Sequence, residues 1–141
     1  MTIRTHTKRI NKSRVVLNKY KSTVEGIITK GANDVRNTAV KSINTQSGGG
    51  VTYQKYNPDR VHTASAPNTP PNTDTGYLVS NIHVVLDGDK LGASVESRAD
   101  YSEALEFGTS KMEPRPFMQP ALEENRPNIR RMYARLKSRG V

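Results

Sequence analysis

Histidines, serines and paired carboxylates are the residues of this chain that could support catalysis. The three histidines, His6, His62 and His83, show neither the i, i+4 spacing nor the neighbouring acids that are typical of a metal site. Glu103 and Glu106 are three residues apart and could act as an acid–base pair on one helix face. On a short helix among other charged residues, such carboxylates are more often solvated or interfacial. We therefore expect no catalytic site, no metal site and no cofactor.

Signatures of nucleophilic catalysis and of phosphate binding are also lacking in the sequence. Ser65 and Ser80 are not flanked by the glycines of a nucleophile elbow. The glycine run 48–50 lacks the Lys-Ser/Thr ending of a phosphate-binding loop. The chain contains no cysteine, which excludes a thiol nucleophile, a disulfide framework and a cysteine-based zinc site. The sequence predicts a protein that is not an enzyme. A pocket that holds an acid or base of perturbed pKa would instead indicate an enzyme.

Positive charge is concentrated at the two ends of the chain. The formal net charge is +9, but residues 1–14 carry five cations and no acid, and residues 126–141 carry six cations and no acid. The intervening body holds 11 cations and 13 acids, so it is close to neutral. Basic ends of this kind can neutralise DNA phosphates or bind acidic patches on a neighbouring protein.

Length and hydropathy indicate one domain with a small core. A chain of 141 residues fits a single domain, here residues 1–141 with a basic N-terminal arm (1–14) and a basic C-terminal end (126–141). Hydrophobic residues make up 33%, with no Trp and two Phe, so part of the apolar burial could lie between subunits. The first residues are polar and no apolar run is long enough to span a bilayer. We expect a soluble protein made in a cytoplasm.

The pattern of apolar residues predicts a long helix at the beginning of the chain. Between residues 11 and 44, Val, Ile, Tyr and Ala recur mostly at spacings of three and four, which is the stripe of an amphipathic helix. Gly26 and Gly31 lie inside it and favour a bend or a break. The glycine run 48–50 ends the helix because glycine is costly in a helix interior.

The middle of the chain is predicted to combine a short strand with a long loop. Residues 51–56 alternate as in a strand, whereas residues 57–74 are rich in Pro, Asn, Thr and Ser and predict an irregular segment. A helical turn near Leu78 then leads into a strand. The turn signal at 87–89 and the alternation of Leu91, Ala93 and Val95 predict a two-stranded antiparallel hairpin.

Two helices are predicted in the last third of the chain. Residues 101–107 read as a short helix, with Gly108 as its left-handed C-terminal cap. Pro120 suits the first turn of a final helix. Pro127 should kink or interrupt that helix, with an apolar face continuing beyond it. The predicted fold class is α+β: a small antiparallel sheet packed against a long N-terminal helix and a C-terminal helix, with a long Pro-rich loop.

Two segments stand out as motifs, HTASAPNTPPNTDTGYL (62–78) and YSEALEFGTSKMEPRPFMQPAL (101–122). In this order they resemble the tail-completion or minor-tail family of long-tailed double-stranded-DNA bacteriophages. Members of that family pair a Ser-x-Pro-Gly-x-Pro-Pro loop ending in Thr-Gly-x-Leu with a later Leu-Glu-Phe-Gly-Thr and Arg-Pro-Phe-x-x-Pro-Ala block. The resemblance covers residues 62–122. Asn68 stands where the family often has Gly, Ser102 where it often has Ala, and Pro127 where its helix usually has no proline.

The resemblance implies a structural virion protein of a siphovirus-type particle. Such a subunit would join a homo-oligomeric ring, a hexamer in the family's manner, that completes the tail and joins it to the head connector while leaving a channel for DNA. Its partners would be tail-terminator or tail-tube proteins on one side and stopper or adaptor proteins on the other. The protein would be made in the bacterial cytoplasm and located in the neck of the virion.

The motif segments supply the candidate contact residues. An extended Pro-rich segment has little chain entropy to lose when it lies across a neighbour, so residues 60–76 are assigned to contacts between subunits or rings. In the second block, Phe107 and Phe117 are candidate apolar anchors, at an interface or in the subunit's own core, and Arg115 could form an ion pair with Glu106. The assigned contact residues are Ser65, Pro67, Pro70, Pro71, Thr75, Gly76, Glu106, Phe107, Gly108, Thr109, Arg115, Pro116 and Phe117.

The basic C-terminal end has two possible roles, contact with DNA in the channel or contact with an acidic partner. The residues concerned are Arg126, Arg130, Arg131, Arg135, Lys137 and Arg139. The alternative function, from a different class, is a small basic nucleic-acid-binding protein. Few aromatic residues lie near basic ones and the body is near neutral, which disfavours a broad phosphate track. No helix-turn-helix or RNP-like pattern is present, so we do not expect sequence-specific DNA recognition.

Overall fold

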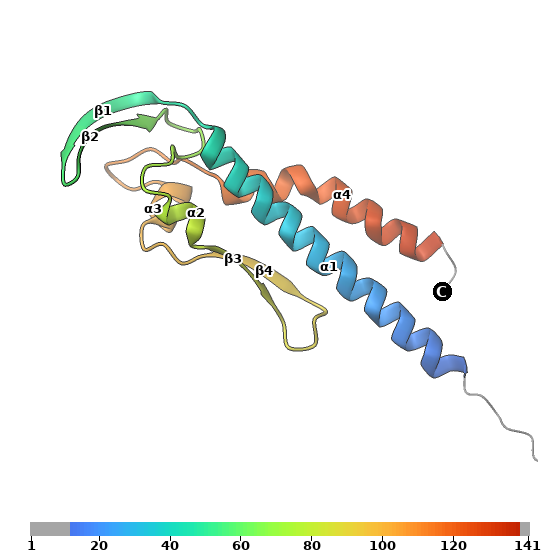
Figure 1. Ribbon diagram of the computed structural model, residues 1–141. Coiled ribbons are helices and arrows are strands. Elements are labelled where there is room, and N and C mark those ends of the chain that lie inside the picture. The colour runs from blue at the N-terminus through green and yellow to red at the C-terminus, as the bar shows by residue number, and fades with distance from the viewer. Residues whose placement is uncertain (1–11, 139–141) are drawn as a thin grey trace, which may run out of the picture.

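The described part of the chain is an elongated α+β structure built along one long helix (Figure 1). The computed structural model describes residues 12–138. Their elements are, in chain order, α1 (Lys12–Thr45), β1 (Gly49–Tyr56), β2 (Asp59–Ser65), α2 (Tyr77–Ser80), β3 (Ile82–Leu86), β4 (Ala93–Ser97), α3 (Ser102–Phe107) and α4 (Met118–Ser138). The predicted α+β class is confirmed, and the strands form two separate antiparallel hairpins.

Helix α1 follows the predicted stripe and is continuous through both internal glycines. The break predicted near Gly26 and Gly31 does not occur. Gly31 is buried, and a Cβ atom at this position would lie 3.1 Å from Cγ1 of Ile129 on α4. A glycine here therefore allows the two helices to approach closely, because a side chain would push Ile129 away.

Helix α4 lies against α1 and runs antiparallel to it (Figure 1). Asn125 of α4 donates a hydrogen bond of 2.8 Å to Oγ1 of Thr38, and farther along α4 Ile129 packs over Gly31. Later residues of α4 thus meet earlier residues of α1. This pairing buries one face of each helix, which is the main source of helix stability in proteins.

The predicted interruption at Pro127 is wrong, because α4 is continuous from Met118 to Ser138. A proline inside a helix removes one backbone hydrogen bond and costs about 3 kcal/mol. Pro127 is exposed, so the carbonyl that loses its donor can be solvated. Residues on both sides of it, Ala121 and Leu136, are buried and hold the helix together as one unit.

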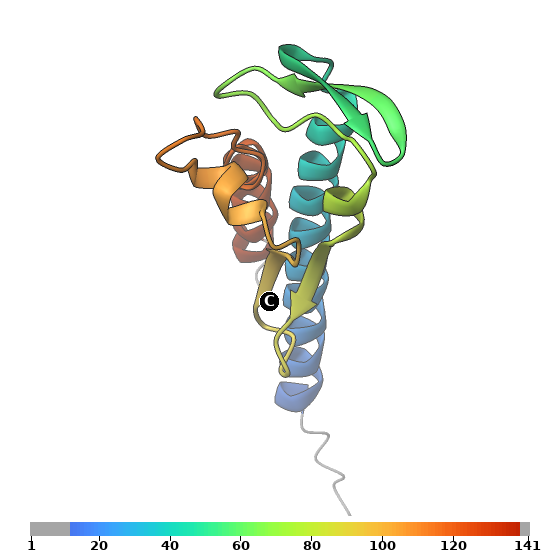
Figure 2. The ribbon, with the colours of Figure 1, turned by 90° about the vertical axis from the view of Figure 1, so that its left-hand side faces the viewer.

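The hairpin of β3 and β4 has the predicted antiparallel pairing, from Ile82 opposite Ser97 to Leu86 opposite Ala93. Its turn is longer than the Asp-Gly-Asp signal alone, and Leu91 lies in the turn rather than in the return strand. The hairpin packs along α1, and the short helix α2 leads into it as predicted (Figure 2). In Figure 1 the hairpin lies on one side of α1 and α4 on the other.

The hairpin of β1 and β2 corrects the prediction of a loop from residue 57. Strand β1 contains the predicted strand, but residues 59–65 form β2 and pair with it, with Tyr53 opposite His62. Pro58 lies in the turn between the two strands and the next proline is Pro67, so residues 59–65 contain no proline that would prevent strand pairing. The Pro-rich loop is thus shorter than predicted and follows β2. The hairpin lies at the C-terminal end of α1 (Figure 1).

The core is small and centred on the C-terminal half of α1. Its buried apolar residues come from α1, α2, β3, the β4–α3 connection, the residue before α4, and α4: Val35, Ala39, Ile43, Leu78, Ile82, Ala99, Phe117 and Ala121. The two candidate anchors separate here. Phe117 is 1% exposed and belongs to the core, whereas Phe107 is 73% exposed.

Replacing Phe117 with Ala should lower the free energy of unfolding by about 3–5 kcal/mol, because it leaves a cavity in the core. The matched change Phe107→Ala should alter it by no more than about 0.5 kcal/mol, since that ring is exposed. Urea unfolding of both variants, followed by circular dichroism at low protein concentration, measures the difference. Equal losses for the two variants would contradict this assignment of the rings.

Candidate functional site

The two motif segments, far apart in sequence, are in direct contact. The backbone N–H of Asn68 donates a 2.8 Å hydrogen bond to the carbonyl of Pro114. The Nε of Arg115 donates a 3.2 Å hydrogen bond to the carbonyl of Ser65. The backbone N–H of Arg115 also bonds the carbonyl of Leu105 on α3. The structure therefore joins the segments into one surface at the end of the molecule.

The Pro-rich segment is partly built into the fold. Pro71 is buried, Pro70 is half-buried and Pro67 is exposed. Asn68 has a φ of 60°, a left-handed conformation that Gly and Asn adopt more readily than other residues. Asn68 thus supplies the same backbone geometry as a glycine would at this position.

Asp74 ties this segment to the β1–β2 hairpin. Its carboxylate pairs with Lys55, with Nη2 of Arg60 at 2.7 Å and with Nδ1 of His62 at 3.6 Å. Burial by itself raises the pKa of Asp74. The hydrogen bond from Lys55 and the positive charges of His62, Lys55 and Arg60 outweigh burial, so the pKa lies below its ordinary value of 3.8. The carboxylate is held ionised beside Lys55, Arg60 and His62.

A small cleft of about 410 Å³ lies beside Asp74, and Tyr77 and Tyr101 line it. The centres of the two tyrosine rings are 6.1 Å apart. Burial, followed by the neighbouring Tyr77 and the acids Asp74 and Asp100, raises the pKa of Tyr101. Its phenol therefore stays protonated. Thr75 and Gly76 directly precede Tyr77 in the sequence, and Gly76 takes a φ of 78° at the start of α2.

Glu106 caps the N-terminus of α4 from the last turn of α3. Its carboxylate accepts hydrogen bonds from the backbone N–H groups of Phe117, Met118 and Gln119, at 2.9, 3.0 and 2.8 Å. The next residue, Pro120, has no N–H, so the first turn of α4 has no free donor. A negative charge at this end also interacts favourably with the helix dipole.

The predicted ion pair between Arg115 and Glu106 is wrong for this reason. The Glu106 carboxylate is directed to the α4 backbone, and Arg115 donates instead to the carbonyl of Ser65. Among residues 12–138, no ion pair joins these two side chains. The N-terminus of a helix offers several N–H donors at once. The fold places the start of α4 next to Glu106, and this proximity could not be predicted from the sequence.

The turn between the two phenylalanines differs in detail from the prediction. Gly108 has a positive φ of 75°, as expected, but its ψ of −179° is extended rather than left-handed helical. A Cβ there would lie 2.8 Å from the carbonyl oxygen of Met112, so Gly fits for space as well as for conformation. Thr109 pairs with Met112 in an isolated bridge. Pro116 is half-buried next to Phe117.

The basic residues of α4 are exposed. Arg126 pairs with Glu123 at 2.8 Å on the helix surface. Further along lie the exposed cations Arg130, Arg131, Arg135 and Lys137. Arg139 lies outside the described residues, as does most of the predicted N-terminal arm, of which the structure describes residues 12–14.

The residues considered for catalysis are dispersed in the structure. His62 lies in β2 rather than in the predicted loop, next to Asp74, and His83 lies in β3; His6 is outside the described residues. Glu106 is used in capping. Within residues 12–138, no three His, Asp or Glu side chains are grouped so as to hold a metal ion. No helix of this region is long and apolar enough to cross a membrane.

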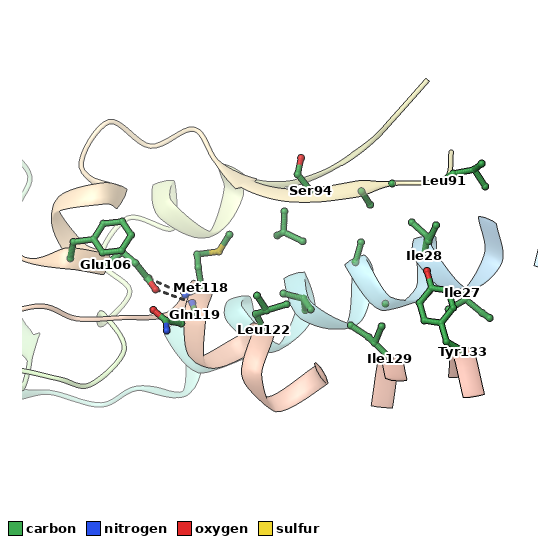
Figure 3. A pocket seen from close by; sticks show the side chains of 17 residues that line it. Ile27, Ile28, Leu91, Ser94, Glu106, Met118, Gln119, Leu122, Ile129 and Tyr133 are labelled. Carbon is green, nitrogen blue, oxygen red and sulfur yellow. Dashed lines mark hydrogen bonds between the residues drawn. The ribbon is translucent and has the colours of Figure 1, made fainter. Parts of the chain in front are cut away.

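An apolar groove is the feature that sequence reasoning missed. It has a volume of about 610 Å³ and is lined by α1, β4 with its preceding turn, the end of α3, and α4. Figure 3 shows Ile28 of α1 facing Leu91 of the hairpin turn, with Ile129 and Tyr133 of α4 beside them. The stripe on α1 predicted an apolar face, but not that its N-terminal part would be left partly uncovered.

Comparisons of this chain with protein-family models, with curated proteins and with solved structures found no match.

Replacing Glu106 with Ala should lower the free energy of unfolding by about 1–3 kcal/mol, because three donors lose a charged acceptor. The matched control is Glu103→Ala on the same helix, where the side chain is exposed and makes no hydrogen bond to the described residues. That change should cost less than about 0.5 kcal/mol. Thermal and urea unfolding of both variants tests the cap, and a Glu106 variant as stable as the control would rule it out.

Asp74 should make the stability of the protein depend on pH in the acid range. Because its pKa is lower in the folded than in the unfolded chain, its contribution is complete above about pH 4 and is lost as pH falls through the folded pKa. Wild type should thus be more stable than Asp74→Asn at pH 6, with the difference shrinking toward pH 2. Urea unfolding across this range measures it. The exposed Asp100→Asn serves as control and should show no such trend.

Proposed function

We propose that this protein is a structural subunit of the neck of a long-tailed double-stranded-DNA bacteriophage. It would form one member of a ring that completes the tail, binds tail-terminator or tail-tube proteins on one side and head-connector proteins on the other, and leaves a channel for DNA. Its place would be the virion, after synthesis in the bacterial cytoplasm. The resemblance of residues 62–122 carries this proposal, and the hexameric state rests on the resemblance alone.

The contact between the two motif segments supports the proposal most directly. The segments resemble the family's two motifs separately along the sequence, yet Asn68 bonds Pro114 and Arg115 bonds Ser65 in the fold. Two segments that together define one surface are what a shared role in binding neighbours requires. Of the assigned contact residues, Pro67, Thr75, Phe107 and Thr109 are exposed and are the ones available to a neighbour.

The distribution of apolar surface gives further support. The core is small, while large apolar side chains at both ends of the molecule are exposed, among them Leu17 at 66%, Tyr56 at 85% and Phe107 at 73%. Large apolar side chains that are exposed in the single subunit are candidates for burial against another protein. A subunit that completes its burial against other copies accounts for this surface.

The exposed cations of α4 fit either of two positions in such a ring. Facing the lumen, they would give weak, sequence-independent contact with DNA phosphates. Facing an adjoining ring, they would bind acidic side chains. They are also the observation that favours the alternative function, a small nucleic-acid-binding protein.

The proposal predicts a ring. Light scattering of the purified protein at low and high concentration, with and without tail tubes from the phage that encodes it, should show a multimer of defined mass. Electron micrographs of that species should show a ring with a central opening. A persistent monomer that ignores tail tubes but binds DNA in a salt-sensitive way at micromolar concentration would overturn the proposal in favour of the nucleic-acid alternative.

A further inference from the structure

The first three turns of α1 have no partner within the described chain. Residues 12–23 are all exposed, and Figure 1 shows this part of α1 extending beyond the end of α4 and beyond the β3–β4 hairpin. At 1.5 Å per residue the segment is about 18 Å long. It nevertheless carries large apolar side chains, with Leu17 66% and Tyr20 43% exposed.

These side chains continue the face of α1 that forms the core. Leu17, Tyr20 and Val24 follow one another at spacings of three and four, so they lie on one face of the helix. The same face continues into Ile27 and Ile28 at the floor of the groove and then into the core. Such anchors at i, i+3 and i+7 are the pattern of a helix that binds in an apolar groove.

The groove on the same molecule is suited to receive a helix of this kind. Its volume of about 610 Å³ can hold several large side chains. Leu91 and Leu122 on its walls are 46% and 43% exposed, so they too lack partners. The first turns of α1 cannot fold back into their own groove, because the groove floor is the continuation of the same helix.

The distribution of charge favours binding of the exposed α1 segment to the groove of another copy over its pairing with the same α1 segment of that copy. Residues 12–21 carry four cations and no acid, so two such segments packed together would repel each other. Residues 87–106, which include the hairpin turn, β4 and α3 around the groove, carry six acids and two cations. On the α4 side the residues that line the groove include no cation. The basic segment is therefore attracted toward the hairpin and α3 side.

We infer that residues 12–24 of one copy bind in the apolar groove of the next copy, with Leu17 and Tyr20 as the anchors. The two surfaces differ, so the contact is heterologous: each copy offers a helix to one neighbour and a groove to the other. Repetition of such a contact forms a closed ring when the rotation from one copy to the next divides a full turn. This inference rests on the proposed function in requiring a second copy, and it names the surfaces that join the copies.

The absence of cysteine from the chain permits a direct test by cross-linking. Single variants Leu17→Cys and Leu91→Cys are prepared separately, mixed, and treated with a short bismaleimide. The mixture should give a covalent dimer, and each variant alone should give little. Cross-linking of Leu17→Cys alone would overturn the inference in favour of symmetric pairing of the α1 segments.

A matched pair of substitutions tests the same contact without a cross-linker. Leu17→Asp places an acid on the proposed binding face, and Val15→Asp places one on the opposite face of the same helical turn, at a residue with nearly the same exposure, 65%. Leu17→Asp should weaken self-association at least tenfold, whereas Val15→Asp should leave it within about twofold. Neither should change the unfolding of the monomer. Leu91→Asp should weaken association in the same way as Leu17→Asp.

The outcomes separate this inference from the proposed function. A ring that forms normally with Leu17→Asp, and in which mixed variants do not cross-link, would refute the inference and leave the ring proposal standing. A wild-type chain that stays monomeric at all concentrations and in the presence of tail tubes would refute both. Loss of association with Leu17→Asp and Leu91→Asp but not with Val15→Asp supports both.

Discussion

Burial of one face of α1 is the constraint on which the other elements depend. Val35, Ala39 and Ile43 lie at the centre of the core, and α4 and the β3–β4 hairpin both pack along this face. Two two-stranded hairpins would be marginally stable by themselves. The β3–β4 hairpin is held because α1 covers its apolar side. The close approach of α4 depends in turn on Gly31, where the absence of a side chain leaves room for Ile129.

A second level of organisation comes from polar groups that join distant segments. Glu106 fixes the start of α4 to the end of α3, Arg115 fixes the following turn to Ser65, and Asp74 fixes the Pro-rich segment to the β1–β2 hairpin. In each case a charged group satisfies backbone donors, a backbone acceptor or opposite charges that would otherwise be left unpaired. These contacts give the motif segments a defined geometry in addition to the burial of Leu78, Phe117 and Ala121 in the core.

The molecule is divided into a packed half and an exposed half. The C-terminal half of α1 is covered on its apolar face, whereas its first turns and the neighbouring groove expose Leu17, Leu91 and Leu122. The exposed part of the helix is basic, and the segment 87–106, which contributes the hairpin and α3 wall of the groove, is net acidic. This arrangement separates the apolar surface that packs within the subunit from the apolar surface that stays exposed.

The sequence by itself determined the elements whose signals are local. The stripe on α1, the turn signal before β4, the short helix before Gly108 and the separation of basic ends from a neutral body could all be read from residue type and spacing. The tertiary structure decided what depends on neighbours. Residues 59–65 became a strand because β1 was available to pair, and α4 continued through Pro127 because α1 holds it on both sides. Glu106 met a helix N-terminus instead of Arg115, and Phe107 and Phe117 separated into surface and core. Local patterns specify which face of an element is apolar, but only the packing of distant segments determines how much of that face is covered.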